Sequence, residues 1–231
     1  KTTTLYSILS KVSTSKVNVV TIEDPVEYQI PGVNQVQVNA QVGLTFASAL
    51  RSFLRQDPDV MMVGEVRDLD TAQMCVRASL TGHLVLSTLH TNDAPSAISR
   101  LVDIGIEPFL LMPSLILIVA QRLVRILCVH CKEPYEPTED EKKGLDLGAD
   151  LIYKPKGCEK CNHVGYSGRI CIAEVLVIND EIRRLIIEKS GATKMMDVAR
   201  AQGMYTLTES ALAKVREGTT SLEEALSASL A

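Results

Sequence analysis

The stretch Val60-Met-Met-Val63-Gly-Glu65 decides the fold, because a short aliphatic run ends abruptly in an acid. Two further runs repeat this pattern: Val17 to Ile22 leads into Glu23, and Leu84 to Leu89 leads into His90. Near-continuous aliphatic runs are typical of strands that are buried on both faces, as in parallel sheets. The three runs therefore predict three strands of a parallel sheet.

Helix-like segments separate these runs, over Phe46 to Leu54 and over Asp70 to Leu80. Alternating strands and helices predict an α/β fold with right-handed crossover connections. Ligands bind beyond the carboxyl ends of the strands in such sheets. Because acids and a histidine follow the predicted strands, we expect a binding site along that edge.

The chain opens with Lys1-Thr2, and apolar residues at helical spacing follow from Leu5 to Val12. Lys-Thr at the start of a helix is also how the phosphate-binding pattern G-x-x-x-x-G-K-[ST] ends, although its glycines are absent here. We therefore expect the chain to be a fragment of a longer protein, with Lys1 at the ligand-binding edge. An exposed lysine at a frayed chain end is the alternative.

These residue types suit a nucleoside triphosphate with magnesium. Lys1 can neutralise phosphate oxygens, and the Thr2 hydroxyl can bind Mg²⁺. Magnesium prefers oxygen ligands, so the Glu65 carboxylate suits its shell. Glu27 or Glu23 can serve as the base that faces the γ-phosphate. Each acid can instead be a solvated surface group, and Glu23 can brace its turn.

Two pairs of cysteines, Cys128-Val-His-Cys131 and Cys158-Glu-Lys-Cys161, are separated by 26 residues. Two C-x₂-C pairs supply the four thiolates of a structural tetrahedral zinc site. Disulfides are the alternative, and the absence of secretion signals in the sequence speaks against them. The neighbouring His130 and His163 can replace a thiolate, although four cysteines already suffice.

The remaining cysteines and histidines carry weaker signals. Cys75 and Cys171 are expected to be small buried hydrophobes. His83 and His90 flank one predicted strand seven positions apart, which places them on opposite faces and excludes a shared metal ion. The residues from Lys132 to Gly157 are expected to form a solvated excursion whose ends the zinc ties together.

Composition limits the classes of function. The chain has 231 residues, 46% of them hydrophobic, and a net charge of −4. Residues 128–231 hold 14 Lys and Arg against 17 Asp and Glu, so neither the chain nor this part has the basic surface of a nucleic-acid binder. The most apolar run, Phe109 to Ala120, is shorter than the ~20 residues that span a bilayer, so we expect no transmembrane insertion.

Three motifs together resemble a known family. Residues 20–27, 54–68 and 81–92 look like the aspartate box, Walker B motif and histidine box of the secretion-traffic ATPases, and more narrowly of the type II secretion and type IV pilus assembly ATPases. The resemblance extends over essentially the whole chain. It implies a RecA-like core that is truncated at its amino end, inside the Walker A motif.

The resemblance implies roles for particular residues. Lys1 and Thr2 match the end of Walker A. Glu23 has no such match and is assigned to the nucleotide and magnesium site from its place at the end of the first predicted strand. Glu27 matches the glutamate that acts as base for the attacking water, and Glu65 matches the Walker B glutamate that acts on Mg²⁺. ATP and Mg²⁺ are therefore the implied ligands.

The resemblance also covers the histidine box and the cysteines. His83 and His90 match residues that sense the γ-phosphate and link it to a neighbouring subunit or domain, and Arg67 joins the same network. Assembly and secretion members carry a tetracysteine zinc subdomain, which retraction members lack. Cys128, Cys131, Cys158 and Cys161 match its Zn²⁺ ligands.

We divide the chain into the RecA-like core at 1–127 and a mainly helical, zinc-bearing extension at 128–231. Ala120 to Arg125 matches a further family segment, and by pattern it is an ordinary amphipathic helix, with the roles of Arg122 and Arg125 open. Asn179 is expected to cap one carboxyl-terminal helix, and Ser221 to Glu224 to form the capping box of another.

The implied function is ATP hydrolysis by a hexameric motor that powers pilin or pseudopilin assembly. Its partners are an inner-membrane platform and assembly proteins, and its place is the cytoplasm at that membrane. Without the phosphate loop, the fragment itself is expected to be inactive. A non-catalytic assembly module and a nucleic-acid motor of the same fold are the alternatives.

Overall fold

The computed structural model describes residues 1–139, 141–142 and 151–230. No helix in these ranges is long and apolar enough to cross a membrane. The chain forms two compact units that are discontinuous in sequence, whereas the sequence prediction divides it once, after residue 127. Unit 1 comprises Lys1–Thr91, Pro95–Ile116 and Ile178–Met195; unit 2 comprises, within the described ranges, Asn92–Ala94, Leu117–Val177 and Met196–Ala231.

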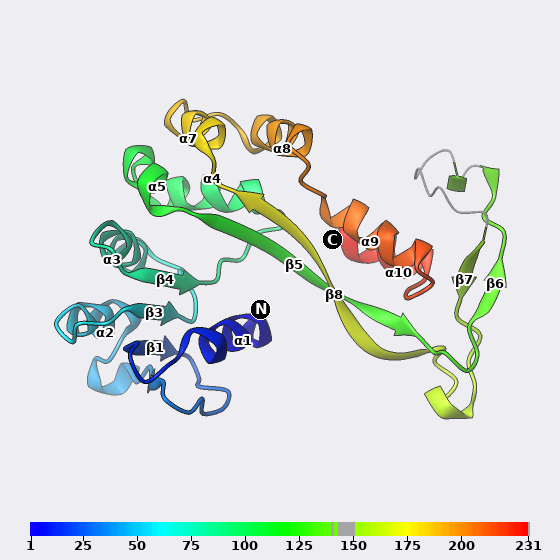
Figure 1. The fold of residues 1–231 in the computed structure, drawn as a ribbon, viewed down its shortest axis with the longest axis horizontal. Coiled ribbons are helices and arrows are strands. Elements are labelled where there is room, and N and C mark those ends of the chain that lie inside the picture. Colours follow the sequence, from blue (N-terminus) through cyan, green and yellow to red (C-terminus); the bar gives the residue numbers. More distant parts are fainter. Residues whose placement is uncertain (140, 143–150, 231) are drawn as a thin grey trace. The chain divides into compact units, whose positions relative to one another are not determined.

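Unit 1 is built on a parallel sheet with strand order β2-β1-β3-β4. Figure 1 labels three of these strands, β1, β3 and β4. The three predicted strands are present as β1 (Val19–Glu23), β3 (Val60–Val63) and β4 (Leu84–Ser87), paired in parallel. The edge strand β2 (Asn34–Gln37) pairs in parallel with β1 and was not predicted. Its sequence Asn-Gln-Val-Gln lacks an aliphatic run, and its residues are exposed or only partly buried. The other edge strand, β4, is also only partly buried, although its sequence is aliphatic.

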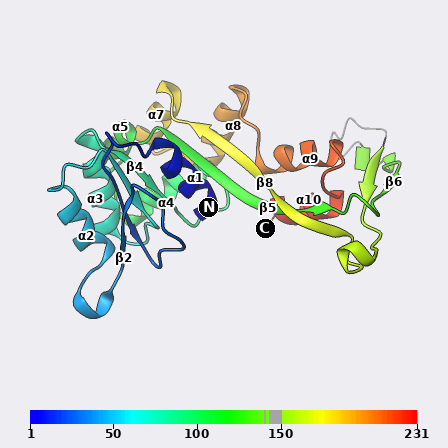
Figure 2. The same ribbon diagram turned by 60° about the horizontal axis from the view of Figure 1, so that its bottom comes forward.

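Helices cover both faces of this sheet. The predicted helices are α2 (Phe46–Phe53), which Thr45 caps, and α3 (Leu69–Leu80), which Asp68 caps. Their apolar side chains pack with Ile22 and Met61 on one face. Helix α1 (Thr2–Val12) covers the other face (Figure 2). Its Tyr6 and Leu9 pack there with Met62.

Four more helices belong wholly or partly to unit 1. Helix α5 (Pro108–Ser114) packs with α7 (Asp180–Ile187), which Asn179 caps as predicted. Helices α4 (Ala94–Ile104) and α8 (Ala192–Ala201) contribute residues to both units. A short 3₁₀ turn, η1, spans Ala40–Val42.

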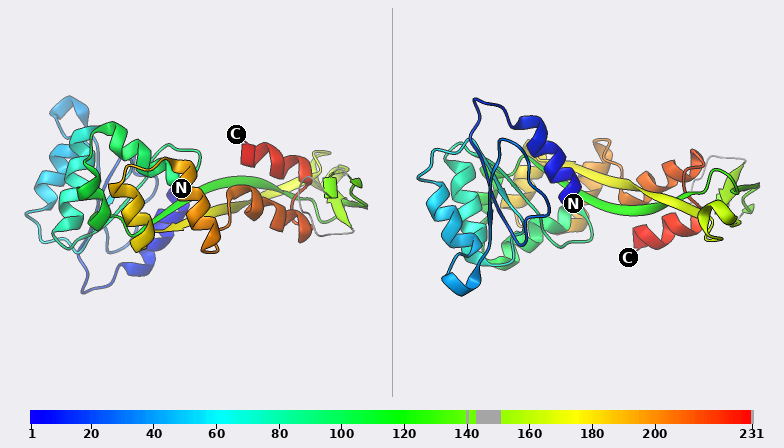
Figure 3. Two further views of the ribbon diagram at one scale, coloured as in Figure 1. Left: turned by 90° about the horizontal axis from the view of Figure 1, so that it is seen from above. Right: turned by 90° about the horizontal axis from the view of Figure 1, so that it is seen from below.

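Unit 2 contains a long antiparallel ribbon of β5 (Leu117–Leu127) and β8 (Tyr166–Val177), which lie side by side in every view (Figure 3). The helical interpretation of Ala120 to Arg125 is therefore wrong. Burial alternates along the strand, with Val124 buried between the exposed Leu123 and Arg125, and this period of two is that of a strand. The same alternation exposes Cys171, which was expected to be buried.

The core of unit 2 lies between this ribbon and two helices, α9 (Leu207–Arg216) and α10 (Leu222–Leu230). The predicted excursion contains a short hairpin of β6 (Glu133–Tyr135) and β7 (Ile152–Lys154). Residues 140 and 143–150 of that excursion lie outside the described residues. A 3₁₀ turn, η2 (Glu159–Cys161), follows the hairpin.

Candidate functional site

The carboxyl ends of β1, β3 and β4 and the start of α1 surround a cavity of about 220 Å³. This is the edge at which ligands bind in parallel α/β sheets. The predicted site residues that line it come from four separate segments: Lys1, Thr2, Glu23, Glu27, Glu65 and His90. The fold therefore brings together groups that lie up to 89 positions apart in the chain.

Lys1 and Thr2 open α1, so the first turn of that helix faces the cavity. The Lys1 ammonium group donates a hydrogen bond to the Leu89 carbonyl, beyond the end of β4. The start of a helix carries a partial positive charge and favours anions. An ammonium group, a hydroxyl and this dipole at one place suit a phosphate group.

Glu23, the last residue of β1, is 3% exposed and holds several hydrogen bonds. Its Oε1 accepts from the Thr21 hydroxyl at 2.5 Å and from Gln35 Nε2 at 3.1 Å. Its Oε2 accepts from the Tyr6 hydroxyl. Both carboxylate oxygens are thus engaged inside the protein, as for a group that braces its turn.

Glu27 lies four residues farther on, in the loop that connects β1 with β2. Its backbone N–H donates to the Tyr6 hydroxyl at 3.1 Å. Burial and the hydrogen bond to Glu23 raise the pKa of Tyr6, so its hydroxyl stays protonated at neutral pH. Sequence reasoning missed Tyr6, because only its contact with Glu23, 17 positions away, distinguishes it from other apolar residues of α1.

Glu65, two residues beyond β3, is paired with an arginine and a histidine of the same edge. Arg67 Nη2 lies 2.5 Å from Glu65 Oε1, and His90 Nε2 lies 3.3 Å from Glu65 Oε2. Only 13% of the Glu65 side chain is exposed, whereas Arg67 and His90 are largely exposed. Glu65 is therefore held in place while its partners reach solvent.

His83 lies apart from this cavity, because it precedes β4 whereas His90 follows it. Its Nδ1 lies 2.9 Å from the Ala78 carbonyl and 3.0 Å from the Thr81 hydroxyl. These contacts are with the end of α3, at the amino edge of the sheet. The structure brings only one of the two predicted histidines to the cavity.

The four predicted zinc ligands of unit 2 cluster together, with their sulfur atoms within 4.8 Å of one another. Cys161 Sγ lies 3.8 Å from both Cys131 Sγ and Cys158 Sγ, and all four thiols are free. Zinc–sulfur bonds of about 2.3 Å arranged as a tetrahedron separate the sulfurs by about 3.8 Å. The donor set therefore fits zinc, whereas the free thiols do not form the alternative disulfides.

Backbone donors already favour a thiolate in this cluster. Burial raises the pKa of Cys161, but N–H groups of Cys158 and Gly165, each 3.2 Å from its sulfur, together with the neighbouring thiols lower it to about 6. Burial and hydrogen bonds with the neighbouring thiols raise the pKa of Cys131 to about 12. A second thiolate beside the first is therefore unfavourable until a cation neutralises both.

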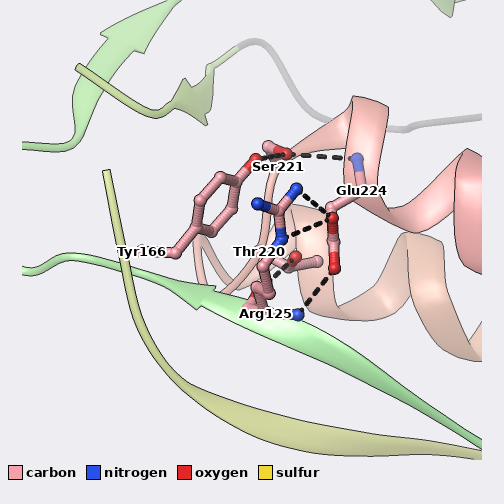
Figure 4. Close-up of polar contacts among 5 residues, drawn as sticks. All are labelled: Arg125, Tyr166, Thr220, Ser221 and Glu224. Carbon is pink, nitrogen blue, oxygen red and sulfur yellow. Dashed lines mark hydrogen bonds and ion pairs between the residues drawn. The ribbon is translucent and has the colours of Figure 1, made fainter. Parts of the chain in front are cut away.

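Arg125, whose role the sequence left open, belongs to a polar network of unit 2 (Figure 4). Glu224 accepts from the backbone N–H, Nε and Nη2 of Arg125 at 2.9, 2.9 and 2.6 Å. The guanidinium group lies 4.0 Å from the centre of the Tyr166 ring, and the Tyr166 hydroxyl lies 2.7 Å from Ser221 Oγ. Only half of the predicted capping box forms: Ser221 accepts from Glu224 N–H at 3.2 Å, but the Glu224 carboxylate binds Arg125.

Two further polar contacts in unit 2 hold the start of α4. Arg122 donates to Asn92 Oδ1 at 3.2 Å. Glu174, 2% exposed, accepts from the backbone N–H groups of Ala94 at 2.8 Å and Leu207 at 3.3 Å. Burial raises the pKa of Glu174. Sequence reasoning missed Glu174, because a lone acid within an aliphatic strand is not a recognisable motif.

Residues 1–227 match the family described as "Type II/IV secretion system protein". The chain belongs to this family. The match confirms the resemblance drawn from the three strand-end motifs. Because it covers nearly the whole chain, both units are part of the shared fold.

Relatives with assigned names agree with this membership. The chain is 52% identical over 231 residues to the type IV pilus assembly ATPase PilB of Thermus thermophilus, covering 98% of this chain and 26% of the relative. It is 51% identical over 229 residues to the type II secretion system ATPase E of Vibrio cholerae, covering 98% and 45%. The chain thus spans less than half the length of these relatives.

Solved structures support the α/β fold class. The structure of the pilus retraction motor PilT with bound ADP aligns with a TM-score of 0.73 and 32% identity, covering 98% of this chain and 57% of that one. The ATPase DotB of Legionella pneumophila aligns with a TM-score of 0.67 and 25% identity. The predicted α/β fold of a P-loop ATPase core is therefore confirmed.

Proposed function

We propose that this chain provides the ATP-hydrolysing site of a motor that assembles pilin or pseudopilin subunits. The observation that carries the proposal is the convergence of Lys1, Thr2, Glu27, Glu65 and His90 on one cavity at the carboxyl edge of the sheet. The names of the relatives support the client, which is a type IV pilus or a type II secretion system.

Magnesium ATP is the substrate in this proposal. The Lys1 ammonium group binds phosphate oxygens, and the first turn of α1 adds its dipole. Thr2 and Glu65 supply the oxygen ligands that suit Mg²⁺, which neutralises charge on the phosphates. Glu27 accepts a proton from the water that attacks the γ-phosphate, so the products are ADP and phosphate.

The remaining residues act around this reaction. His90 and Arg67 bind Glu65 and fix its carboxylate, and His90 senses the γ-phosphate from the end of β4. Glu23 serves the nucleotide site indirectly, as a brace beneath the cavity. We assign His83 to a contact with a neighbouring subunit on the resemblance of the histidine box alone, since it lies at the edge of the sheet opposite the cavity.

The proposal extends to assembly and to zinc. The complete protein forms a homo-oligomer, a hexamer, that works on inner-membrane platform and assembly proteins from the cytoplasmic side. Cys128, Cys131, Cys158 and Cys161 hold a structural Zn²⁺, which neutralises their thiolates and ties the two cysteine pairs together.

Glu27→Gln tests the catalytic assignment. The amide keeps the size of the side chain but cannot accept the proton, so steady-state ATP turnover of the full-length gene product should fall by about 10²-fold or more. Binding of a fluorescent ATP analogue should stay within about twofold of wild type, because Glu27 is not assigned to the phosphates.

Glu107→Gln is the matched control, because Glu107 is an exposed acid before α5 whose side chain makes no capping bond. It should turn over ATP like wild type. Unchanged turnover in Glu27→Gln would remove Glu27 from the role of base. Absence of magnesium-dependent turnover in a folded wild-type oligomer would instead favour the non-catalytic assembly module, and turnover that requires DNA would favour a nucleic-acid motor.

A further inference from the structure

The Tyr6 hydroxyl lies between two glutamates that sequence reasoning treated as alternatives. It donates to Glu23 Oε2 and accepts from the backbone N–H of Glu27 at 3.1 Å. Tyr6 is 1% exposed and Glu23 is 3% exposed. The bond to Glu23 therefore forms where water competes little, whereas the bond from Glu27 N–H is only partly buried, because Glu27 itself is exposed.

The direction of the hydroxyl proton is fixed by chemistry. A phenol has one proton to donate, and a carboxylate can only accept. Tyr6 therefore gives its proton to Glu23, and its oxygen is left as an acceptor for Glu27 N–H. Glu23 cannot turn away, because Thr21 and Gln35 bind its other oxygen.

Other side chains also hold the loop that carries Glu27. Next to Glu27, the Val26 N–H donates a hydrogen bond to Gln37 Oε1 at 3.3 Å. Gln35 fixes the far side of the loop, where its Oε1 accepts from Ile30 N–H at 2.6 Å and its Nε2 donates to the Tyr28 carbonyl at 3.2 Å. The Tyr28 ring packs edge-on against Tyr6, with ring centres 4.6 Å apart. Tyr6 thus contacts the loop by its hydroxyl at Glu27 and by its ring at the next residue.

We propose that Tyr6 is a positioning residue that holds Glu27 at the cavity by binding its backbone N–H, with Glu23 orienting the hydroxyl. The inference rests on the proposed role of Glu27 as base. Because Tyr6 stands on the helix that begins with Lys1 and Thr2, one rigid element sets both the phosphate-binding groups and the base. A base displaced by about 1 Å can cost on the order of 10² in rate.

Tyr6→Phe removes only the hydroxyl and keeps the ring contact. In the full-length gene product, kcat for ATP should fall about tenfold or more while KM changes less than about twofold, since the phosphate-binding groups stay in place. If Tyr6 acts through Glu27, adding Tyr6→Phe to Glu27→Gln should lower turnover no further than Glu27→Gln alone.

Two further variants separate positioning from a general loss of stability. Ser79→Ala removes a hydrogen bond of unit 1 that does not involve Glu23, the one from the Ser79 hydroxyl to the Ser114 carbonyl at 3.0 Å, so it should keep kcat within about twofold even where it lowers the melting temperature. Tyr166→Phe removes a tyrosine hydroxyl in unit 2 that contacts only Ser221 among the hydrogen bonds described, and it should leave kcat unchanged.

Three outcomes would overturn the inference: kcat of Tyr6→Phe within twofold of wild type, an equal loss in Ser79→Ala, or additive losses in the double variant. If Glu27→Gln is inactive while Tyr6→Phe is normal, the positioning role fails and the proposed function stands. If Glu27→Gln remains active, the assignment of the base fails, and a kcat loss in Tyr6→Phe then cannot act through that base.

Discussion

The two units order a glutamate in different ways. In unit 1, Glu23 receives its hydrogen bonds from neutral donors: the Tyr6 and Thr21 hydroxyls and the Gln35 amide. In unit 2, Glu224 receives three bonds from Arg125, a cation that also stacks on Tyr166. Unit 2 further gathers four thiols that fit a metal ion.

The difference follows from what each network connects. The Glu23 network ends on the backbone of Glu27, which lines the cavity, so its geometry has consequences for chemistry. The Glu224 network connects β5 with the start of α10, and Thr220 adds a bond to the Arg125 carbonyl at 2.8 Å. Its geometry has consequences for the fold of unit 2. We therefore expect the Arg125–Glu224 ion pair and the proposed zinc ion to affect mainly the stability of unit 2.

The largest expected difference between the two units is the response to a substitution that prevents zinc binding. Cys161→Ser removes the sulfur that lies 3.8 Å from two others, so zinc bound per chain, measured by mass spectrometry after dialysis against a chelator, should fall to near zero. Amide hydrogen exchange should accelerate on the order of tenfold or more around both cysteine pairs and leave β1 and β3 unchanged.

Cys171→Ser is the matched control, because Cys171 is exposed on β8 and outside the cluster. It should retain zinc and the exchange rates of wild type. Full zinc occupancy in Cys161→Ser would contradict a four-thiolate site, and faster exchange in β1 would erase the contrast between the units.

The contrast also shows how far the sequence could be interpreted. Aliphatic runs such as Val60–Val63 predicted the buried strands, and the residues that follow them predicted most of the cavity, because both signals are local. Strand β2 was missed because it is polar, and Ala120 to Arg125 was misassigned because its period emerges only against β8. Tyr6 could not be found, since its role depends on a contact across the fold.

The next effect in size is on acid stability. The hydrogen bonds from Arg125, offset in part by burial, lower the pKa of Glu224. A carboxyl whose folded pKa is depressed stabilises the fold above its unfolded pKa of about 4.3, and this contribution is lost as the pH falls through the folded pKa. Since Arg125 is half exposed, screening limits the interaction to about 1–2 kcal/mol at neutral pH.

Glu224→Gln should therefore lower the free energy of unfolding at pH 7 by about 1–2 kcal/mol. Between pH 5 and pH 3, the free energy of unfolding should fall less in this variant than in wild type. Urea denaturation followed by circular dichroism at a series of pH values measures both. Glu223→Gln, its exposed neighbour, provides the comparison within the same helix. Parallel pH curves for wild type and Glu224→Gln would show that the ion pair contributes nothing to acid sensitivity.

The smallest effect is expected when tyrosine is replaced by phenylalanine in each of the two networks separately. Tyr166→Phe removes the hydroxyl that lies 2.7 Å from Ser221 Oγ but keeps the ring beneath the Arg125 guanidinium, so it should cost only about 0.5–1.5 kcal/mol of unfolding free energy. Tyr6→Phe removes a hydroxyl whose bonds end at Glu27, so its effect should appear in turnover beyond any change in stability. Denaturation and ATPase assays on both variants give a two-by-two comparison. If Tyr166→Phe lowered turnover as much as Tyr6→Phe, the two networks would not differ in kind, and stability alone would explain both results.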